Sequence, residues 1–309
     1  MPRDLADVLH YLIPGSDSSP ETPPERLAEP HAPAQAPTAR QARTRTPTPR
    51  RQEGGSGLPT RRAEPAVLPI VGIPIGDRDV VRAAFGWNLA VEVARLGARA
   101  AVVAPIADRA SALWPEESIR PMGADVVLVP ATNLEELYRC ACEIAADGNA
   151  ASSALEGGAV FVRIPPLWLR GLQSGRGGNG AELLRWTLLF TSSEERDLLE
   201  SYGIVKLVTR LTPGARVLVT IHGASHQGEA EAAFSKLEEV VRRRLAGHVT
   251  SCGLLVDDLH VYRAIVAQRP IGMVHPQSPA ARSMREVAEL VLAEAQAGSE
   301  PPRTAEEHG

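Results

Sequence analysis

Runs of apolar residues alternate with amphipathic segments along most of the chain after residue 65. The strand-like runs cover residues 66–73, 98–104, 124–130, 158–164, 186–191, 216–222 and 250–256. Helical patterns cover residues 79–96, 132–147, 193–210, 228–246, 258–268 and 278–297. Continuous apolar strands that alternate with helices are typical of a parallel sheet covered on both faces. The pattern predicts one doubly wound, mostly parallel α/β domain over residues 66–297.

The first fifteen residues carry a different pattern. Apolar side chains recur there at helical spacing, at Leu5, Val8, Leu9, Leu12 and Ile13, and predict a short amphipathic helix. A helix this short is marginal alone, so it has to dock on a surface. Its own core and the groove of a protein partner are the two alternatives. We expect a protein partner, because a long linker separates the helix from the core.

That linker, residues 16–65, is rich in Pro, Ala, Thr, Ser and Arg and is predicted to be disordered, because it has too little apolar surface to bury. Its later half is basic, with arginines at residues 40, 43, 45, 50, 51, 61 and 62 against glutamates at 53 and 64. We expect a solvated tether, with weak, salt-dependent contact to nucleic acid or anionic lipid as the alternative. Residues 298–309 are predicted to form a disordered acidic tail.

Composition narrows the classes of function. A net charge of −4 over 309 residues is too small to indicate nucleic-acid or membrane binding by bulk attraction. The three cysteines, Cys140, Cys142 and Cys252, have neither disulfide-framework nor metal-ligand spacing, which favours reduced thiols and a cytoplasmic location. No apolar run approaches the ~18–20 residues of a membrane span. We therefore expect no membrane association.

Three segments carry a family resemblance. They are NLAVEVARLGARAAVVAP at residues 88–105, LLFTSSEERDLLESYGIVKLVTR at 188–210, and GLLVDDLHVYRAIVAQRPIGMVHPQSPAARSMREVAELV at 253–291. In order and spacing they resemble the MinD/ParA-type P-loop ATPases of the SIMIBI class, and most closely the FlhG flagellar-regulator branch. The resemblance implies a P-loop NTPase-like fold, with a phosphate loop after the first strand.

The implied phosphate loop lacks most residues that its chemistry requires. Such a loop uses glycines to bring backbone amides to the phosphates, a lysine for charge and a hydroxyl for Mg²⁺. Counting back from Asn88, the family's G-K-G-G-x-G-K-[ST] falls on GDRDVVRA, residues 76–83. Gly76 keeps the first glycine, whereas Asp77 and Arg82 replace the two lysines and Ala83 offers no metal ligand.

Other positions that the resemblance assigns to the nucleotide site depart as well. Arg163, in FVRIPP, stands where switch II has a carboxylate. His222, or Thr220 after a one-residue slip, stands where the family has a base-contacting asparagine. Val256 replaces a proline two residues before Asp258, which itself matches the family's pattern. Departures in each of these motifs together predict a pseudoenzyme.

Two further interpretations concern single clusters. Asp79 places a second acidic charge where a triphosphate would lie, and we expect it to pair with Arg78 or Arg82. A phosphate contact by Arg82 is the alternative. His222, His226 and Asp258 could form a metal site only with suitable geometry, so we expect no metal. GRGGNG, residues 175–180, follows no clean strand and is predicted to be a mobile loop insertion.

The sequence therefore favours a regulatory or adaptor protein in spatial organisation, such as flagellar placement or partitioning, with no catalytic residue and no cofactor. Its expected partner is a protein that binds the N-terminal helix. Homodimerisation, or a heterodimer with an active paralogue, is a further expectation from the resemblance. The alternatives are an ATPase that binds Mg·ATP through an atypical loop, and a nucleic-acid-associated protein that acts through the basic linker.

Overall fold

The computed structural model describes residues 67–76, 79–106, 124–147, 157–172 and 178–297. The predicted docking helix with Leu5, Val8, Leu9, Leu12 and Ile13, the linker 16–65 and the tail 298–309 lie outside the described residues. Asp77 and Arg78 lie outside them too.

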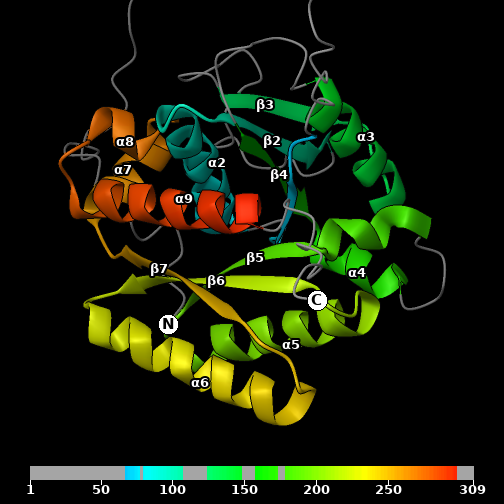
Figure 1. Cartoon of the computed structure of the whole chain (residues 1–309). Coiled ribbons are helices and arrows are strands. Elements are labelled where there is room, and N and C mark those ends of the chain that lie inside the picture. Colours follow the sequence, from blue (N-terminus) through cyan, green and yellow to red (C-terminus); the bar gives the residue numbers. More distant parts are fainter. Residues whose placement is uncertain (1–66, 77–78, 107–123, 148–156, 173–177, 298–309) are drawn as a thin grey trace, which may run out of the picture. The chain divides into compact units, whose positions relative to one another are not determined.

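Seven parallel strands form one sheet in the order β3-β2-β4-β1-β5-β6-β7 (Figure 1). The strands are β1 (Ile70–Pro74), β2 (Arg99–Pro105), β3 (Ala124–Val129), β4 (Gly158–Ile164), β5 (Trp186–Ser192), β6 (Arg216–Ala224) and β7 (Thr250–Val256). Each of them coincides with a predicted run. The predicted doubly wound parallel sheet is confirmed.

The long helices also match the predicted ones. They are α2 (Val80–Arg95), α3 (Leu134–Asp147), α5 (Glu195–Leu211), α6 (Gln227–Leu245), α7 (Leu259–Val266) and α9 (Pro279–Ala297). Three short elements were not predicted, because they are too short to show a helical period: α4 (Pro166–Leu172), the 3-10 helix η2 (Gly178–Leu184) and α8 (Ile271–Val274). In these segments no helix has the length and apolar character needed to cross a bilayer.

Helices cover both faces of the sheet (Figure 1). Along β5 the side chains alternate: Leu188 and Phe190 pack in the core under α2 and α9, whereas Leu189 packs in the core under α3, α5 and α6. All seven residues of β4, which lies between β2 and β1 in the interior of the sheet, are buried. This burial on both faces explains why the strands read as continuous apolar runs.

The last three residues of GRGGNG begin η2 and do not form the loop that the sequence predicted. A tight contact fixes this element on the sheet. At Gly72 of β1 a Cβ would overlap the carbonyl oxygen of Leu183 in η2, so a residue without a side chain lets the two backbones meet.

The strand order places four strand ends beside one another. β1 lies between β4 and β5, and β6 follows β5. The chain leaves β1 towards β2 on one side and later passes from β4 to β5 on the other, which makes β1 a topological switch point. The carboxyl ends of β1, β4, β5 and β6 therefore meet at one edge, where ligands bind in open parallel sheets.

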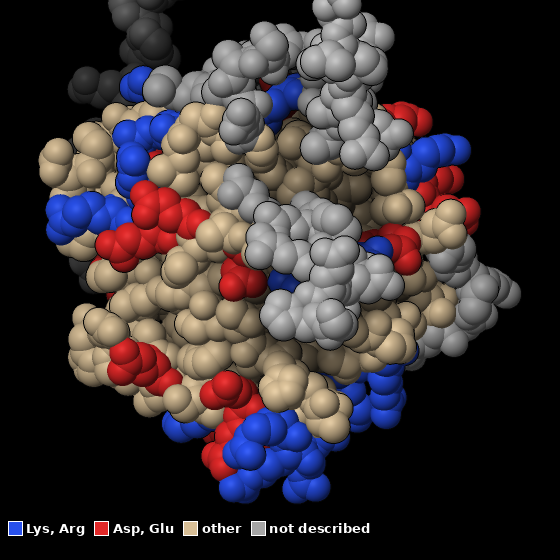
Figure 2. Space-filling view, viewed as in Figure 1, with Lys and Arg blue, Asp and Glu red and all other residues tan. Residues whose placement is uncertain are grey.

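Charge is unevenly distributed over the surface. Figure 2 shows Lys and Arg gathered at the bottom of the view, over the end of α6 that is coloured gold in Figure 1. The sequence assigns that end three consecutive arginines, Arg242, Arg243 and Arg244, and all three are exposed.

Candidate functional site

The described residues at the two ends of the connection from β1 to α2 form hydrogen bonds within the chain. The amide of Ile75 donates to the carbonyl of Ile164 at 3.1 Å, and that of Asp79 donates to the carbonyl of Gly76 at 3.1 Å. Asp79 is the N-cap of α2, and its carboxylate accepts from the amide of Arg82 at 2.9 Å. Helix N-termini attract anions. At α2 this place is taken by a side chain of the protein.

Arg82 lies in the first turn of α2 and is held by three carboxylates. Its guanidinium is 3.1 Å from Oδ2 of Asp79, 2.9 Å from Oδ2 of Asp197 and 3.4 Å from Oε2 of Glu200. The side chain is only 11% exposed. Of the two partners predicted for Asp79, Arg78 and Arg82, the structure shows the pair with Arg82, and two carboxylates from α5 complete the cluster. We call Arg82, Asp79, Asp197 and Glu200 the arginine clamp.

The pKa values of the arginine clamp follow from burial and from these pairings. Burial opposes the charge on Arg82, but the attraction of the three carboxylates outweighs it and raises the arginine pKa. For Asp79 burial outweighs the attraction of Arg82, so the pKa of that carboxyl is raised. Burial also opposes the charge on Asp197. The hydrogen bond that Ser192 Oγ donates at 2.6 Å, together with Arg82, nevertheless lowers the pKa of Asp197.

His222 contacts the arginine clamp through Arg82 and packs against Phe85. It lies at the carboxyl end of β6, with its ring centroid 5.3 Å from that of Phe85. Burial, and then the nearby positive charge of Arg82, lower the pKa of His222 to about 4. The imidazole is therefore neutral at pH 7, and its Nε2 lies 3.4 Å from Nε of Arg82, which donates to it.

Arg163 occupies the end of β4, opposite Ile73 of β1. Its side chain is buried, with 4% of the residue exposed, and Nη2 donates to the carbonyl of Gly76 at 3.1 Å. The position that the resemblance assigns to an acidic switch II residue thus carries a cation. This hydrogen bond joins β4 to Gly76, at the start of the β1–α2 connection.

The remaining predicted positions have structural contacts. Asp258 is the N-cap of α7: it accepts from the amide of His260 at 2.9 Å, from that of Ala280 at 3.4 Å, and contacts Nδ1 of His260 at 2.8 Å. Val256 ends β7 opposite Ala224. Ala83 is buried, in the core between α2 and the sheet.

The alternative metal site is not assembled. His226 caps α6, where its Nδ1 accepts from the amide of Glu229 at 3.2 Å. Asp258 caps α7, and His222 faces Arg82. In the part of the chain that the structure describes, no group of three or more metal-ligating side chains has the arrangement to hold an ion.

Of the predicted positions, the structure therefore brings Gly76, Arg82, Arg163 and His222 to one edge of the sheet. Sequence reasoning missed Asp197 and Glu200. Their distance along the chain from Arg82 conceals the contact, because Glu200 lies 118 residues away. The position of the two residues could have indicated the contact, because Asp197 and Glu200 follow β5, and β5 lies beside β1 in the sheet.

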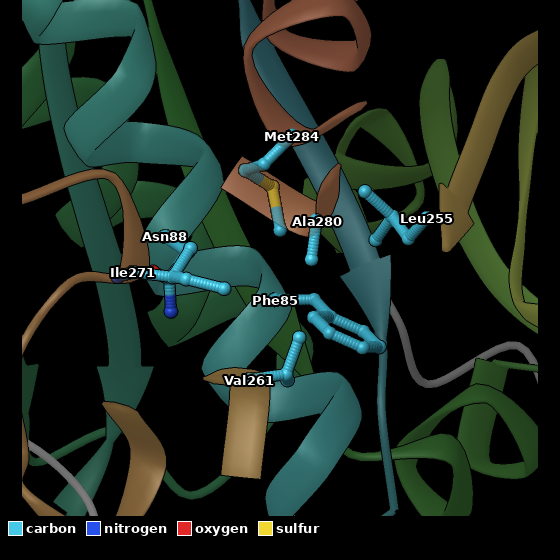
Figure 3. A pocket seen from close by; sticks show the side chains of 7 residues that line it. All are labelled: Phe85, Asn88, Leu255, Val261, Ile271, Ala280 and Met284. Carbon is cyan, nitrogen blue, oxygen red and sulfur yellow. The ribbon is translucent and has the colours of Figure 1, made fainter. Parts of the chain in front are cut away.

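A small pocket lies beside this edge, between α2, β7, α7, α8 and α9. In Figure 3, Phe85, Val261, Ala280, Met284 and Leu255 surround it, and Asn88 and Ile271 lie together at one side. Asn88 donates to the carbonyl of Ala84 and accepts from the amide of Ile271, both at 2.8 Å. The cavity volume is about 10 Å³. That suffices for about one water molecule, whereas ligand pockets measure roughly 300–1,000 Å³.

Comparisons with known proteins bear on the fold. No protein-family model matches the sequence, and no curated protein matches it. Among solved structures, the MinD cell division protein of Aquifex aeolicus matches with a TM-score of 0.52 and 12% identity over 73% of this chain and 97% of that one. The septum site-determining protein MinD of Pyrococcus horikoshii OT3, complexed with Mg-ADP, matches with a TM-score of 0.51 and 12% identity, over 72% and 96%.

At this identity the likeness concerns the fold. The described core has the P-loop NTPase-like architecture of MinD, a seven-stranded parallel sheet flanked by helices.

Proposed function

We propose that this protein is a nucleotide-independent pseudoATPase of the MinD/FlhG type, which acts as a regulatory or adaptor protein in spatial organisation. The observation that carries the proposal is the arginine clamp. Arg82 aligns with the lysine that would contact a phosphate, yet three carboxylates of the same chain already pair with it. The amide end of α2 is likewise capped by Asp79.

Electrostatics argue against a triphosphate at this place. One pair of unit charges at ~4 Å in a partly screened site is worth about 4 kcal/mol. A triphosphate near Arg82 would meet like charge on Asp79, Asp197 and Glu200, and it would have to displace their pairings. One guanidinium cannot offset several such repulsions. The site is therefore built for an internal cation–carboxylate cluster.

The residues present do not fit Mg·ATP either. A phosphate loop places a hydroxyl on Mg²⁺, but its position is the buried Ala83. Walker B-type sites add a carboxylate for the metal, whereas Arg163 brings a guanidinium that is hydrogen-bonded to Gly76.

Calorimetric titration of the full-length protein with Mg·ATP tests this part of the proposal. We expect no binding tighter than about 100 μM. The double variant Asp197→Asn/Glu200→Gln removes the two α5 carboxylates that pair with Arg82. It should still not bind Mg·ATP, because the chain still lacks the hydroxyl and the carboxylate that would hold Mg²⁺. Wild-type binding tighter than this limit that disappears in Arg82→Ala would refute nucleotide independence and favour the alternative of an atypical ATP-binding loop.

The adaptor role rests on the amphipathic pattern at residues 1–15, with Leu5, Val8, Leu9, Leu12 and Ile13 on one face. Pull-down from the native cell extract compares the full-length protein with Leu9→Asp, which places a charge on that face. His10→Asp is the matched control, since it places the same charge on the polar side. Loss of a partner in Leu9→Asp alone supports recruitment, and equal recovery from both variants would exclude it.

We also propose that the α/β core forms a dimer, either with a second copy of this chain or with an active paralogue. Leu167 on α4 and Leu199 on α5 are each 63% exposed, and Leu199 adjoins Glu200 of the arginine clamp. Light scattering after gel filtration, with and without ATP, should give the same assembly state in both conditions. A dimer that requires ATP would contradict nucleotide independence.

A further inference from the structure

The two helices α5 and α6 end in a cluster of cations at the sheet edge opposite the arginine clamp. The cluster consists of Lys206 and Arg210 on α5, and Arg242, Arg243 and Arg244 on α6. We call these five residues the basic edge. The chain carries no acidic residue at 201–226 or at 240–256, and the nearest carboxylates in the sequence are Glu238 and Glu239, one turn before the arginines on α6.

The fold brings the two halves of the basic edge together. Both helices follow parallel strands, so both end at the amino edge of the sheet. Their ends touch: a Cβ on Gly247, just after α6, would lie 3.7 Å from the methyl group of Thr209, which precedes Arg210. Figure 2 shows the Lys and Arg side chains over the end of α6 as one exposed group.

Little of this charge is neutralised locally. Arg243 pairs with Glu239, and among the described residues no other member of the basic edge has a carboxylate at ion-pair distance. One cation in the last turn of each helix would suffice to complement the helix dipole. Three consecutive arginines on α6 exceed that need, in a chain whose net charge is −4. The excess points to an anionic partner.

We propose that the basic edge binds the phosphate backbone of duplex nucleic acid. A duplex carries one charge per ~1.7 Å of its axis, and each phosphate that a protein neutralises releases counterions. Arginine forms paired hydrogen bonds with phosphate, and the exposed α6 arginines offer three guanidinium groups. The proposal is independent of the pseudoATPase assignment, because the basic edge lies at the opposite edge of the sheet from the arginine clamp.

Fluorescence anisotropy with a labelled random-sequence duplex of about 30 base pairs, at about 50 mM salt, tests the proposal on the full-length protein. The test variant is Arg242→Gln/Arg243→Gln/Arg244→Gln. The control, Arg263→Gln/Arg269→Gln/Arg285→Gln, removes the same three charges from exposed positions on α7, after α7 and on α9. Glutamine keeps helix propensity close to that of arginine, and circular dichroism checks that both variants fold.

We expect the test variant to bind about ten-fold more weakly or worse, and the control to stay within about two-fold of the wild type. The plot of log affinity against log salt should lose about 2.7 from its slope in the test variant, at 0.9 per phosphate contact. Equal weakening in both variants, no weakening in the test variant, or no duplex binding by the wild type would overturn the proposal. If the protein instead binds phosphatidylglycerol vesicles in a sedimentation assay and does not bind the duplex, the proposal is also overturned.

The basic linker needs its own control, because it could bind the duplex alone. In the full-length protein its arginines at residues 40, 43, 45, 50, 51, 61 and 62 are changed to glutamine. The proposal expects this variant to keep the difference between the test triple and the control triple. If duplex binding vanishes with the linker charges and the α6 arginines have no effect, the basic edge is not the binding surface.

Discussion

The neutral state of the partly buried His222 predicts a specific loss of stability in mild acid. An unfolded histidine has a pKa of about 6.5, whereas burial and then Arg82 lower the pKa of folded His222 to about 4. As pH falls from 6.5 to 4, the unfolded chain binds a proton that the folded protein does not. Stability therefore falls as pH falls through this window, by about 2 kcal/mol between pH 7 and pH 5.

Urea unfolding followed by circular dichroism, at pH 7 and at pH 5, measures this loss. His222→Gln keeps a neutral hydrogen-bonding side chain but removes the titrating group, so its stability should fall by about 2 kcal/mol less than that of the wild type. His248→Gln, at an exposed position beyond α6, is the control and should follow the wild type. If His222→Gln loses as much stability as the wild type, His222 is not held neutral by its surroundings.

Three further predictions concern packing and reactivity. Gly272→Ala should lower the free energy of unfolding by about 1–3 kcal/mol, since a Cβ there would overlap the buried carboxylate of Glu92, whereas Gly203→Ala, with nothing within 4 Å, should raise it by about 0.5–1 kcal/mol; urea unfolding compares the two. Asn88→Ala should cost about 1–3 kcal/mol in the same assay, because the amide of Ile271 loses its partner. Cys252, whose pKa burial raises to about 12, should react with a thiol reagent only after unfolding, while the two partly exposed cysteines react in the native protein.

Each of these has an outcome that contradicts its reasoning. Equal effects of the two glycine substitutions would mean that helix propensity, and not the contact with Glu92, decides the result. An Asn88→Ala variant as stable as the wild type would mean that α8 does not depend on this hydrogen bond. Labelling of all three thiols at one rate in the native state would contradict the burial of Cys252.

Much of the fold could be predicted because the burial of a sheet determines the local pattern of apolar residues in the sequence. A strand covered on both faces, such as β4, must be apolar at every position, and the helices between strands must be amphipathic. The short elements α4, η2 and α8 have too few residues to show such a pattern, and their positions depend on tertiary contacts. η2, for example, depends on the close approach of Leu183 to Gly72.

In the candidate site, too, some features could be predicted from the sequence and others required the tertiary structure. The sequence alone determined the parallel α/β architecture and limited the partner of Asp79 to a nearby arginine, Arg78 or Arg82, since residues three apart on a helix are neighbours; the structure shows the pair with Arg82. Only the tertiary structure decided that Asp197 and Glu200 complete the arginine clamp and that His222 is partly buried and neutral. Those properties depend on which strand ends are adjacent and on how much water reaches them, and such long-range burial and charge have no local pattern in the chain.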